Sequence, residues 1–153
     1  MKNITRNAEQ VAVAVVILGL ILRLLEIELA DTILMIGLLT LSFVYLMFGM
    51  LAINNNLQYL PIAQTGDTLT TVAKMISGLC GLAMSIAAIG IMFRILHWPS
   101  WQFMLMTGVV ACAVCLLLCY LVVRPQHEKL ASFLNYRMVM MLGMSLLLMY
   151  SSL

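Results

Sequence analysis

The sequence predicts an all-α fold: a polytopic helical membrane protein with four transmembrane helices, arranged as two tandem parallel-repeat hairpins, and a short fifth C-terminal helix. Two observations predict this class. Of the 153 residues, 64% are hydrophobic and 9% are charged, with a mean hydropathy of +1.10, whereas a soluble domain carries roughly 25% charged residues to wet its surface. The apolar residues also gather in runs of about 20, the length that crosses a bilayer. The lipid bilayer is therefore the predicted partner, and a net charge of +2 argues against nucleic-acid binding.

Four apolar runs are long enough to span a bilayer, and two short links join them in pairs. The runs are Ile4–Leu25, Thr32–Ile53, Val72–Leu96 and Trp101–Val123. The links, Glu26–Asp31 and His97–Ser100, are so short that each must join two antiparallel neighbours. The first run continues into Arg23 without a small-residue cleavage pattern, so we expect a retained helix rather than a signal peptide.

A fifth run, Met138–Leu153, has sixteen uncharged residues, which is short for a span. We expect it to cross with snorkelling ends. The chain is then one membrane domain over residues 1–153. Its predicted parts are hairpin repeat 1 (about 4–53), a cytoplasmic loop (54–71), hairpin repeat 2 (about 72–123), a basic loop (124–137) and the C-terminal helix (138–153).

The lysines and arginines predict the orientation of this multi-pass chain. In the predicted topology, Arg23 and Arg94 fall on one side of the bilayer. The other side holds Lys2, Arg6, Lys74, Arg124, Lys129 and Arg137. Because cytoplasmic loops carry the excess of basic residues, six against two places the N-terminus and both longer loops in the cytoplasm.

A shift of 71 residues aligns the first hairpin with the second without a gap. Over Ala12–Ile53, eight residues are identical to their partners. The informative matches are Gly19 with Gly90, Arg23 with Arg94, and Gly37 with Gly108. Arginine is rare inside spans, so its recurrence counts for more than matched leucines. We interpret the chain as a duplicated hairpin, its copies parallel and related by an axis along the membrane normal.

The second hairpin tip combines Arg94, His97, Trp98, Pro99 and Trp101. Proline lacks an N–H group and disfavours helix at the residue before it, so the third helix should end near His97. The two tryptophans suit the headgroup region. Arg94 is then within snorkelling distance of the interface. On this interpretation the tip is an interfacial belt without a further role.

The duplication offers a second interpretation of the same tip. Arg23 and Arg94 at equal depth would repel each other unless a carboxylate lies between them. Glu26 and Glu28 occupy the first tip. We therefore predict that Arg94 or His97 pairs with Glu26 or Glu28 and ties the two hairpins together.

The four cysteines all lie inside apolar segments. Cys112, Cys115 and Cys119 share one face of the fourth helix by their spacing. A Cys-x-x-Cys pair at 112 and 115 is also a redox spacing, but Cys112 is predicted near mid-membrane, where thiolates are disfavoured. Small residues dominate helix interfaces in membranes, so we expect Cys112 to be a packing residue.

No catalytic, cofactor-binding or metal-binding motif is predicted. His97 and His127 fall on opposite sides of the predicted bilayer, so they cannot hold one haem between them. The sequence contains no phosphate-binding loop and no nucleophile–base arrangement. We expect a protein that is not an enzyme and uses no cofactor.

The second hairpin resembles a known family. Its pattern is G90-x-x-F93-R94-I95-x-H97-W98-P99, followed by M104-L105-x-x-G108. It is similar to the transmembrane hairpin of GldL, the membrane subunit of the gliding-motility and type 9 secretion motor of Bacteroidetes. The resemblance implies a bacterial inner-membrane protein that works as a homo-oligomer or with a membrane-complex partner.

This chain departs from the family pattern where the family's motor function is concerned. The family carries a glutamate, held to move the proton, four residues after the glycine of the second helix. Counting from Gly108, that position is Cys112, and counting from Gly37 it is Leu41. Ser100 replaces the usual glycine after the proline. With these departures, the resemblance counts against this chain being a proton-conducting stator by itself.

Three functional hypotheses follow. The first is a non-catalytic scaffold or accessory subunit of a membrane complex. The alternative is a small transporter or channel, with a path between the repeats lined by Arg23 and Arg94. The third is a membrane enzyme that uses the cysteines or His97.

Overall fold

The computed structural model describes residues 4–54, 70–125 and 127–150, with side chains from residue 7 onward. Its helices are α1 (Ile4–Leu24), α2 (Ala30–Ile53), α3 (Thr71–Ile95), α4 (Trp101–Leu118), the π-helix η2 (Cys119–Val123) and α5 (Glu128–Tyr150). Five helical segments are long and apolar enough to cross a membrane, α4 and η2 counting as one. The predicted polytopic helical fold is confirmed, and the chain is a multi-pass membrane protein.

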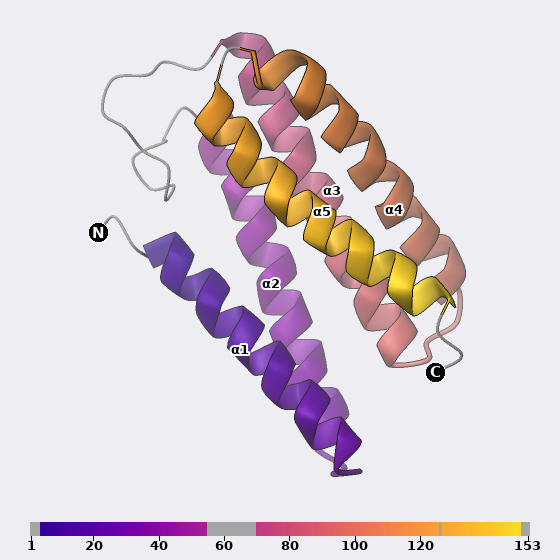
Figure 1. Ribbon diagram of the computed structural model, residues 1–153. Coiled ribbons are helices and arrows are strands. Elements are labelled where there is room, and N and C mark those ends of the chain that lie inside the picture. Colours follow the sequence, from indigo (N-terminus) through magenta and orange to yellow (C-terminus); the bar gives the residue numbers. More distant parts are fainter. Residues whose placement is uncertain (1–3, 55–69, 126, 151–153) are drawn as a thin grey trace.

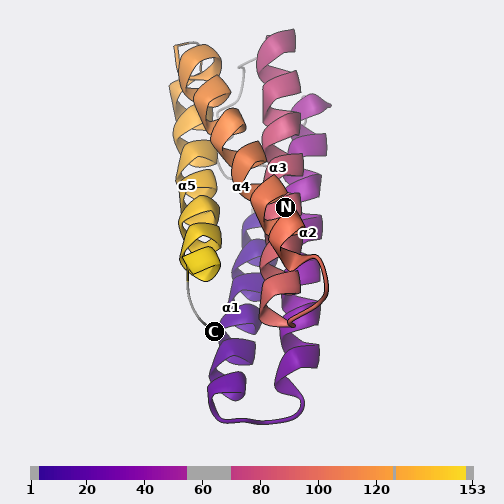
Figure 2. The same ribbon diagram turned by 90° about the vertical axis from the view of Figure 1, so that its right-hand side faces the viewer.

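The helix α3 lies at the centre of the bundle. It packs against α2 on one side and against α4 and α5 on the other, while α1 packs along α2 at the edge (Figures 1 and 2). Accordingly 72% of the α3 span is buried inside the protein, compared with 11% of the α1 span. The sequence of α3 suits this position because it is rich in alanine, glycine and serine, which allow close helix contact.

The contact between α2 and α3, which joins the two hairpins, is a close backbone approach. A Cβ added at Gly81 would lie 2.7 Å from the Cα of Gly49. Further along the same interface, the hydroxyls of Ser42 and Ser85 are hydrogen-bonded at 2.6 Å. Small residues and a satisfied polar pair are the usual means of helix association in lipid, where apolar surface alone gives no driving force.

The helices α1 and α3 end in the same motif. Glu26 and His97, which are 71 residues apart, both have positive φ, at 55° and 53°. The turn at each is closed by two backbone hydrogen bonds, Glu26 N–H to Arg23 O and Ile27 N–H to Leu22 O, then His97 N–H to Arg94 O and Trp98 N–H to Phe93 O. This pattern is a Schellman motif, which satisfies the last carbonyls of a helix.

The fifth helix is longer than the sequence predicted. The expected basic loop over 124–137 is wrong, because α5 begins at Glu128 rather than Met138 and has 23 residues. At 1.5 Å per residue this helix is about 34 Å long, enough to cross the hydrocarbon core. The extra turns contain Arg137, which the sequence analysis assigned to the loop. Most of the predicted loop 54–71, and residues 151–153, lie outside the described residues.

The fourth span ends in a π-helix that continues α4. Arg124 N–H donates to Cys119 O at 3.0 Å, a bond between residues five apart. Wider turns of this kind insert one residue into an α-helix and change the direction of its side chains. Pro125 follows directly, and since it cannot donate a backbone hydrogen bond the helix stops there.

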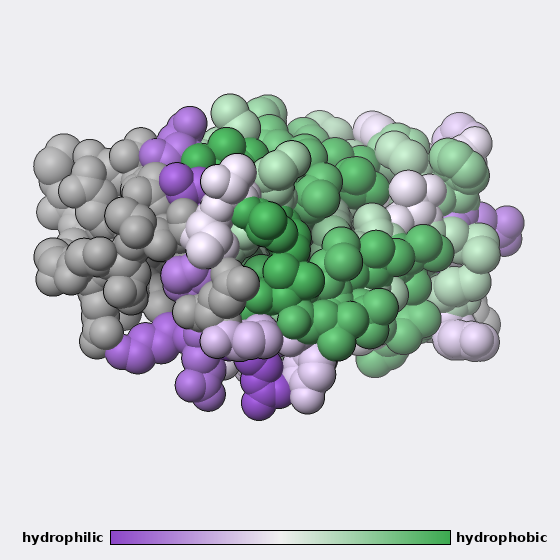
Figure 3. Space-filling model, turned by 90° about the horizontal axis from the view of Figure 1, so that it is seen from above, coloured by the Kyte–Doolittle hydropathy of each residue, from purple (hydrophilic) through white to green (hydrophobic). Residues whose placement is uncertain are grey.

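The outer surface is apolar between polar ends. Figure 3 shows one face, with hydrophobic residues in green across the middle and hydrophilic residues in purple gathered towards the edges. Large side chains such as Val11, Phe43, Phe103 and Leu147 are exposed on four different helices. Since such a surface is unfavourable in water, it is the surface that contacts the lipid bilayer.

Candidate functional site

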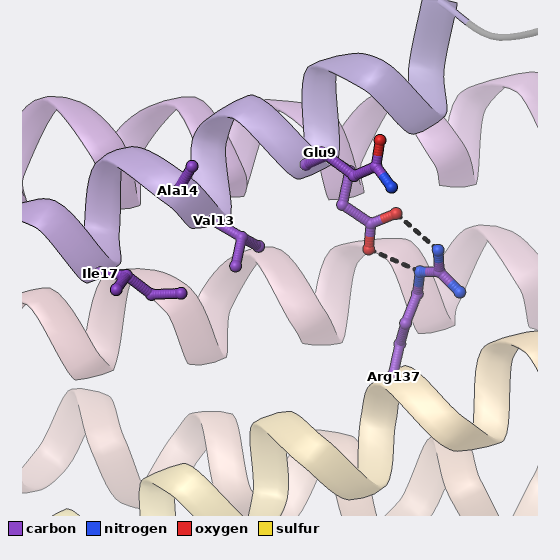
Figure 4. A pocket seen from close by; sticks show the side chains of 6 residues that line it. Glu9, Val13, Ala14, Ile17 and Arg137 are labelled. Carbon is purple, nitrogen blue, oxygen red and sulfur yellow. Dashed lines mark hydrogen bonds and ion pairs between the residues drawn. The ribbon is translucent and has the colours of Figure 1, made fainter.

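An ion pair between α1 and α5 is the main charged contact in the described interior. Arg137 donates from Nε to Glu9 Oε1 at 2.7 Å and from Nη2 to Glu9 Oε2 at 2.5 Å. The side chains of Arg137 and Glu9 are only 16% and 12% exposed. Two parallel N–H···O bonds are the strongest geometry for an arginine–carboxylate pair. Figure 4 shows the pair reaching across the space between the two helices.

Aromatic rings hold the guanidinium of Arg137 in place. Its Cζ lies 3.6 Å from the ring centroid of Phe133, one turn earlier on α5, and 5.7 Å from that of Phe48 on α2. The two rings meet edge to face, with centroids 5.9 Å apart. A cation over an aromatic face is worth more when water is excluded. Arg137 thus links three helices, α1, α2 and α5.

The ion pair closes one end of an open groove between α1 and α5. The groove has a volume of about 430 Å³. Its lining residues are Glu9, Gln10, Val13, Ala14, Ile17 and Arg137. Figure 4 shows the apolar residues following Glu9 along α1. The groove is polar at the N-terminal end of α1 and apolar beyond it.

The arginine of the first tip contacts the end of the second hairpin. Arg23 donates from Nη1 to the carbonyl of Ile95, near the end of α3. The same nitrogen lies 3.4 Å from Asp31 Oδ1. Terminal carbonyls of a helix carry partial negative charge, so a cation is favourable there. Arg23 therefore joins the two tips, a role that the sequence analysis gave to Arg94.

The arginine of the second tip contacts α5 in a similar way. Arg94 Nε donates to the carbonyl of Leu148 at 3.1 Å. Its guanidinium stacks on Trp101, with Cζ 4.1 Å from the ring centroid. Each tip arginine thus binds a carbonyl near the end of the next helix that runs in the same direction.

The remaining predicted tip residues lie at the surface. Glu26, Glu28, His97 and Pro99 are exposed. Trp98 is 40% exposed and meets Phe93 edge to face, with centroids 5.0 Å apart. The predicted pairing of Arg94 or His97 with a glutamate of the first tip stays a prediction.

The cysteines lie in the interior, between α3 and α4. All four are buried and free. Cys80 Sγ donates to the backbone carbonyl of Cys115 at 3.9 Å. Cys112 is fully buried, and so is nearly all of Leu41, the equivalent position in the first hairpin. Among the described residues, no group of three or more histidine, cysteine, aspartate or glutamate side chains suits a metal ion.

The Glu9–Arg137 pair was not predicted from the sequence. A signal was available, since one acidic and one basic residue each border an apolar run, and ionisable residues in a span are paired as a rule. Treating Arg137 as part of a loop removed it from consideration. The 128 residues between the two partners give no local pattern that would connect them.

The comparisons with known proteins identify a family that resembles the first hairpin. Residues 10–63 match the GldL N-terminal domain family. The match covers α1 from Gln10 onward, all of α2 and the ten residues that follow Ile53. The predicted resemblance to the GldL transmembrane hairpin is confirmed, and it falls on the first hairpin, whereas the motif containing His97 lies in the second. No curated protein and no solved structure matches the chain.

Proposed function

We propose that this chain is a non-catalytic scaffold or accessory subunit of a membrane complex of the gliding-motility and type 9 secretion kind. The match of residues 10–63 to the GldL N-terminal domain is the observation that supports it most. The packed interior supports it as well, because its largest fully buried side chains are apolar: Leu34, Met84, Leu105 and Met138. A dry core of this kind suits a protein that holds helices at fixed positions.

The two hairpins are, in this proposal, tandem copies of one unit. Several contacts recur at an offset of 71 residues. Gly19 faces Leu34 as Gly90 faces Leu105, and Gly37 faces Val16 as Gly108 faces Ala87. The positive φ of Glu26 and of His97 recurs at the same offset. Equivalent residues in equivalent contacts are the expected result of a duplication that kept its packing.

The proposed orientation places the N-terminus in the cytoplasm of a bacterial cell, with the chain in the inner membrane. With Arg137 paired inside the bundle, the basic residues on the N-terminal side number five: Lys2, Arg6, Lys74, Arg124 and Lys129. Two, Arg23 and Arg94, lie at the tips. Five against two still favours a cytoplasmic N-terminus.

A transporter with a path between the hairpins is the alternative, and the packing does not favour it. Such a path would pass between α2 and α3. There the backbones of Gly49 and Gly81 approach too closely to admit even a methyl group without a shift. Arg23 and Arg94 donate to carbonyls near the ends of helices, which are positioning contacts.

The proposal is tested by affinity purification of the tagged full chain from its own membranes in a mild detergent, followed by mass spectrometry. A scaffold is expected to purify with a defined integral-membrane partner in fixed stoichiometry. The matched control is the variant Arg23→Gln, which weakens the contact between the tips while leaving the lipid-facing surface intact. Recovery of the wild-type chain as a monomer alone would contradict the proposal.

A further inference from the structure

The groove between α1 and α5 is amphipathic along its length. Glu9 and Gln10 line one end, and Val13, Ala14 and Ile17 line the rest. At 1.5 Å per residue, the step from Glu9 to Ile17 is about 12 Å along α1. Glu9 lies two residues inside the apolar span that begins at Asn7, about 3 Å along the helix, and so near one end of that span. The order from polar to apolar is therefore that of a phospholipid in the same leaflet.

The ion pair at the polar end keeps unused hydrogen-bonding capacity. An arginine has five N–H donors, and a carboxylate has about four acceptor positions. Arg137 uses two donors on Glu9 and one on the carbonyl of Phe133. Two donors and two acceptor positions remain. Gln10 adds an exposed amide, which is both donor and acceptor.

We propose that this groove is a binding site for one phospholipid with a phosphoethanolamine headgroup. One acyl chain lies along Val13, Ala14 and Ile17. The phosphate accepts the remaining N–H donors of Arg137, and the ammonium donates to the remaining acceptor positions of Glu9. The guanidinium of Arg137 is therefore paired with the lipid phosphate, and the carboxylate of Glu9 is paired with the lipid ammonium.

Charge and hydrogen bonding select this headgroup. The Glu9–Arg137 pair has no net charge, so it gives an anionic lipid no overall attraction and leaves Glu9 unfavourable beside it. A phosphocholine is zwitterionic but has no N–H donor for the carboxylate. Of the ethanolamine, choline and glycerol headgroups, only phosphoethanolamine offers both a phosphate acceptor and ammonium donors without a net charge.

The dimensions favour a lipid chain over a helix from another protein. A helix with its side chains is 10–12 Å across and would lie mostly outside so small a groove. The groove holds about 430 Å³. A single acyl chain is thin enough to enter without separating α1 from α5.

The test uses the purified full chain in detergent after removal of its lipids. Dioleoyl lipids with ethanolamine, choline or glycerol headgroups are added separately, and bound lipid is counted by native mass spectrometry. We expect one tightly held phosphatidylethanolamine, with affinity about tenfold higher than for the other two, since a hydrogen bond to a charged group is worth about that factor. Equal affinity for the three lipids would overturn the assignment.

Two variants locate the site. Ile17→Trp fills the groove and should abolish retention of the lipid. Ile21→Trp, on the same helix and exposed to a similar extent, lies outside the lining residues and should retain it. If Ile17→Trp does not fold, Ala14→Leu replaces it, because Ala14 is exposed and also lines the groove. Unchanged lipid binding in a folded groove variant would contradict the proposal. This test does not depend on the scaffold function.

Discussion

At the scale of single residues, three arginines inside or beside apolar helices each bind an acceptor that the fold supplies. Arg23 and Arg94 use carbonyls near helix ends, while Arg137 uses the carboxylate of Glu9. Placing an arginine at the centre of a span costs about 2.5–3.5 kcal/mol on insertion scales. Such a residue is retained only where a partner offsets this cost, so each arginine fixes the position of one helix relative to another.

Removal of one partner from the Glu9–Arg137 pair is expected to destabilise the protein strongly. Glu9→Leu leaves the guanidinium buried without a counter-charge, and we expect it to lower the free energy of unfolding by about 3–5 kcal/mol. Adding Arg137→Leu should restore most of that loss, since a pair of apolar residues has no desolvation cost. The measurement is unfolding in a detergent titration. Gln10→Leu is the control, with an expected change within about 0.5 kcal/mol.

Losses that add in the double variant, rather than partly cancelling, would show that the two side chains do not interact. That result would remove the one described ionic contact between α1 and α5.

At the scale of elements, the α2–α3 interface holds the two hairpins together through small residues. We expect Gly81→Ala to lower stability by about 1–3 kcal/mol, because its methyl group would meet the backbone of Gly49. Gly143→Ala on α5 is the matched control, since nothing lies within 4 Å of the added Cβ. It should be neutral or stabilising by up to about 1 kcal/mol, as alanine is the better helix former. Thermal unfolding of both variants in one detergent compares them directly, and equal behaviour would contradict the close approach.

The first four helices could be predicted from the sequence because long apolar runs bounded by charged or breaking residues determine them almost alone. The ends of α1 and α3 followed from the same reasoning. The start of α5 could not be predicted, since Arg137 is charged in the sequence and becomes tolerable in a span only through the contacts that the fold gives it. The π-helix could not be predicted either, because nothing in the amino-acid composition of this segment indicates it.

The candidate site was predicted less well than the fold. Arg23 and Arg94 were recognised as a matched pair, and both bind across helices. Their partners, however, are backbone carbonyls, and every residue carries one. A sequence identifies an arginine that needs a partner without showing which carbonyl lies opposite. The partners predicted from the sequence were therefore the carboxylates of Glu26 and Glu28.

At the scale of the whole molecule, α3 is the centre and α1 the periphery. The outer helix packs against α2, from which it diverges towards its N-terminal end, and it reaches α5 through the Glu9–Arg137 pair (Figure 1). Most of its apolar surface faces outward, so α1 is the helix that lipids contact most. In the proposed scaffold, the rigid part is the packed group of α2 to α5.

In the proposed topology the two hairpins cross the membrane in parallel, with both tips on the outer side. Labelling of single cysteines with a membrane-impermeant maleimide tests it most directly. The native cysteines are buried, and the exposed positions Glu28, Ser100 and Lys129 are replaced by cysteine one at a time. We predict that Glu28→Cys and Ser100→Cys are labelled in intact cells, and that Lys129→Cys is labelled only after the membrane is opened. Labelling of the two tips from opposite sides would contradict the account.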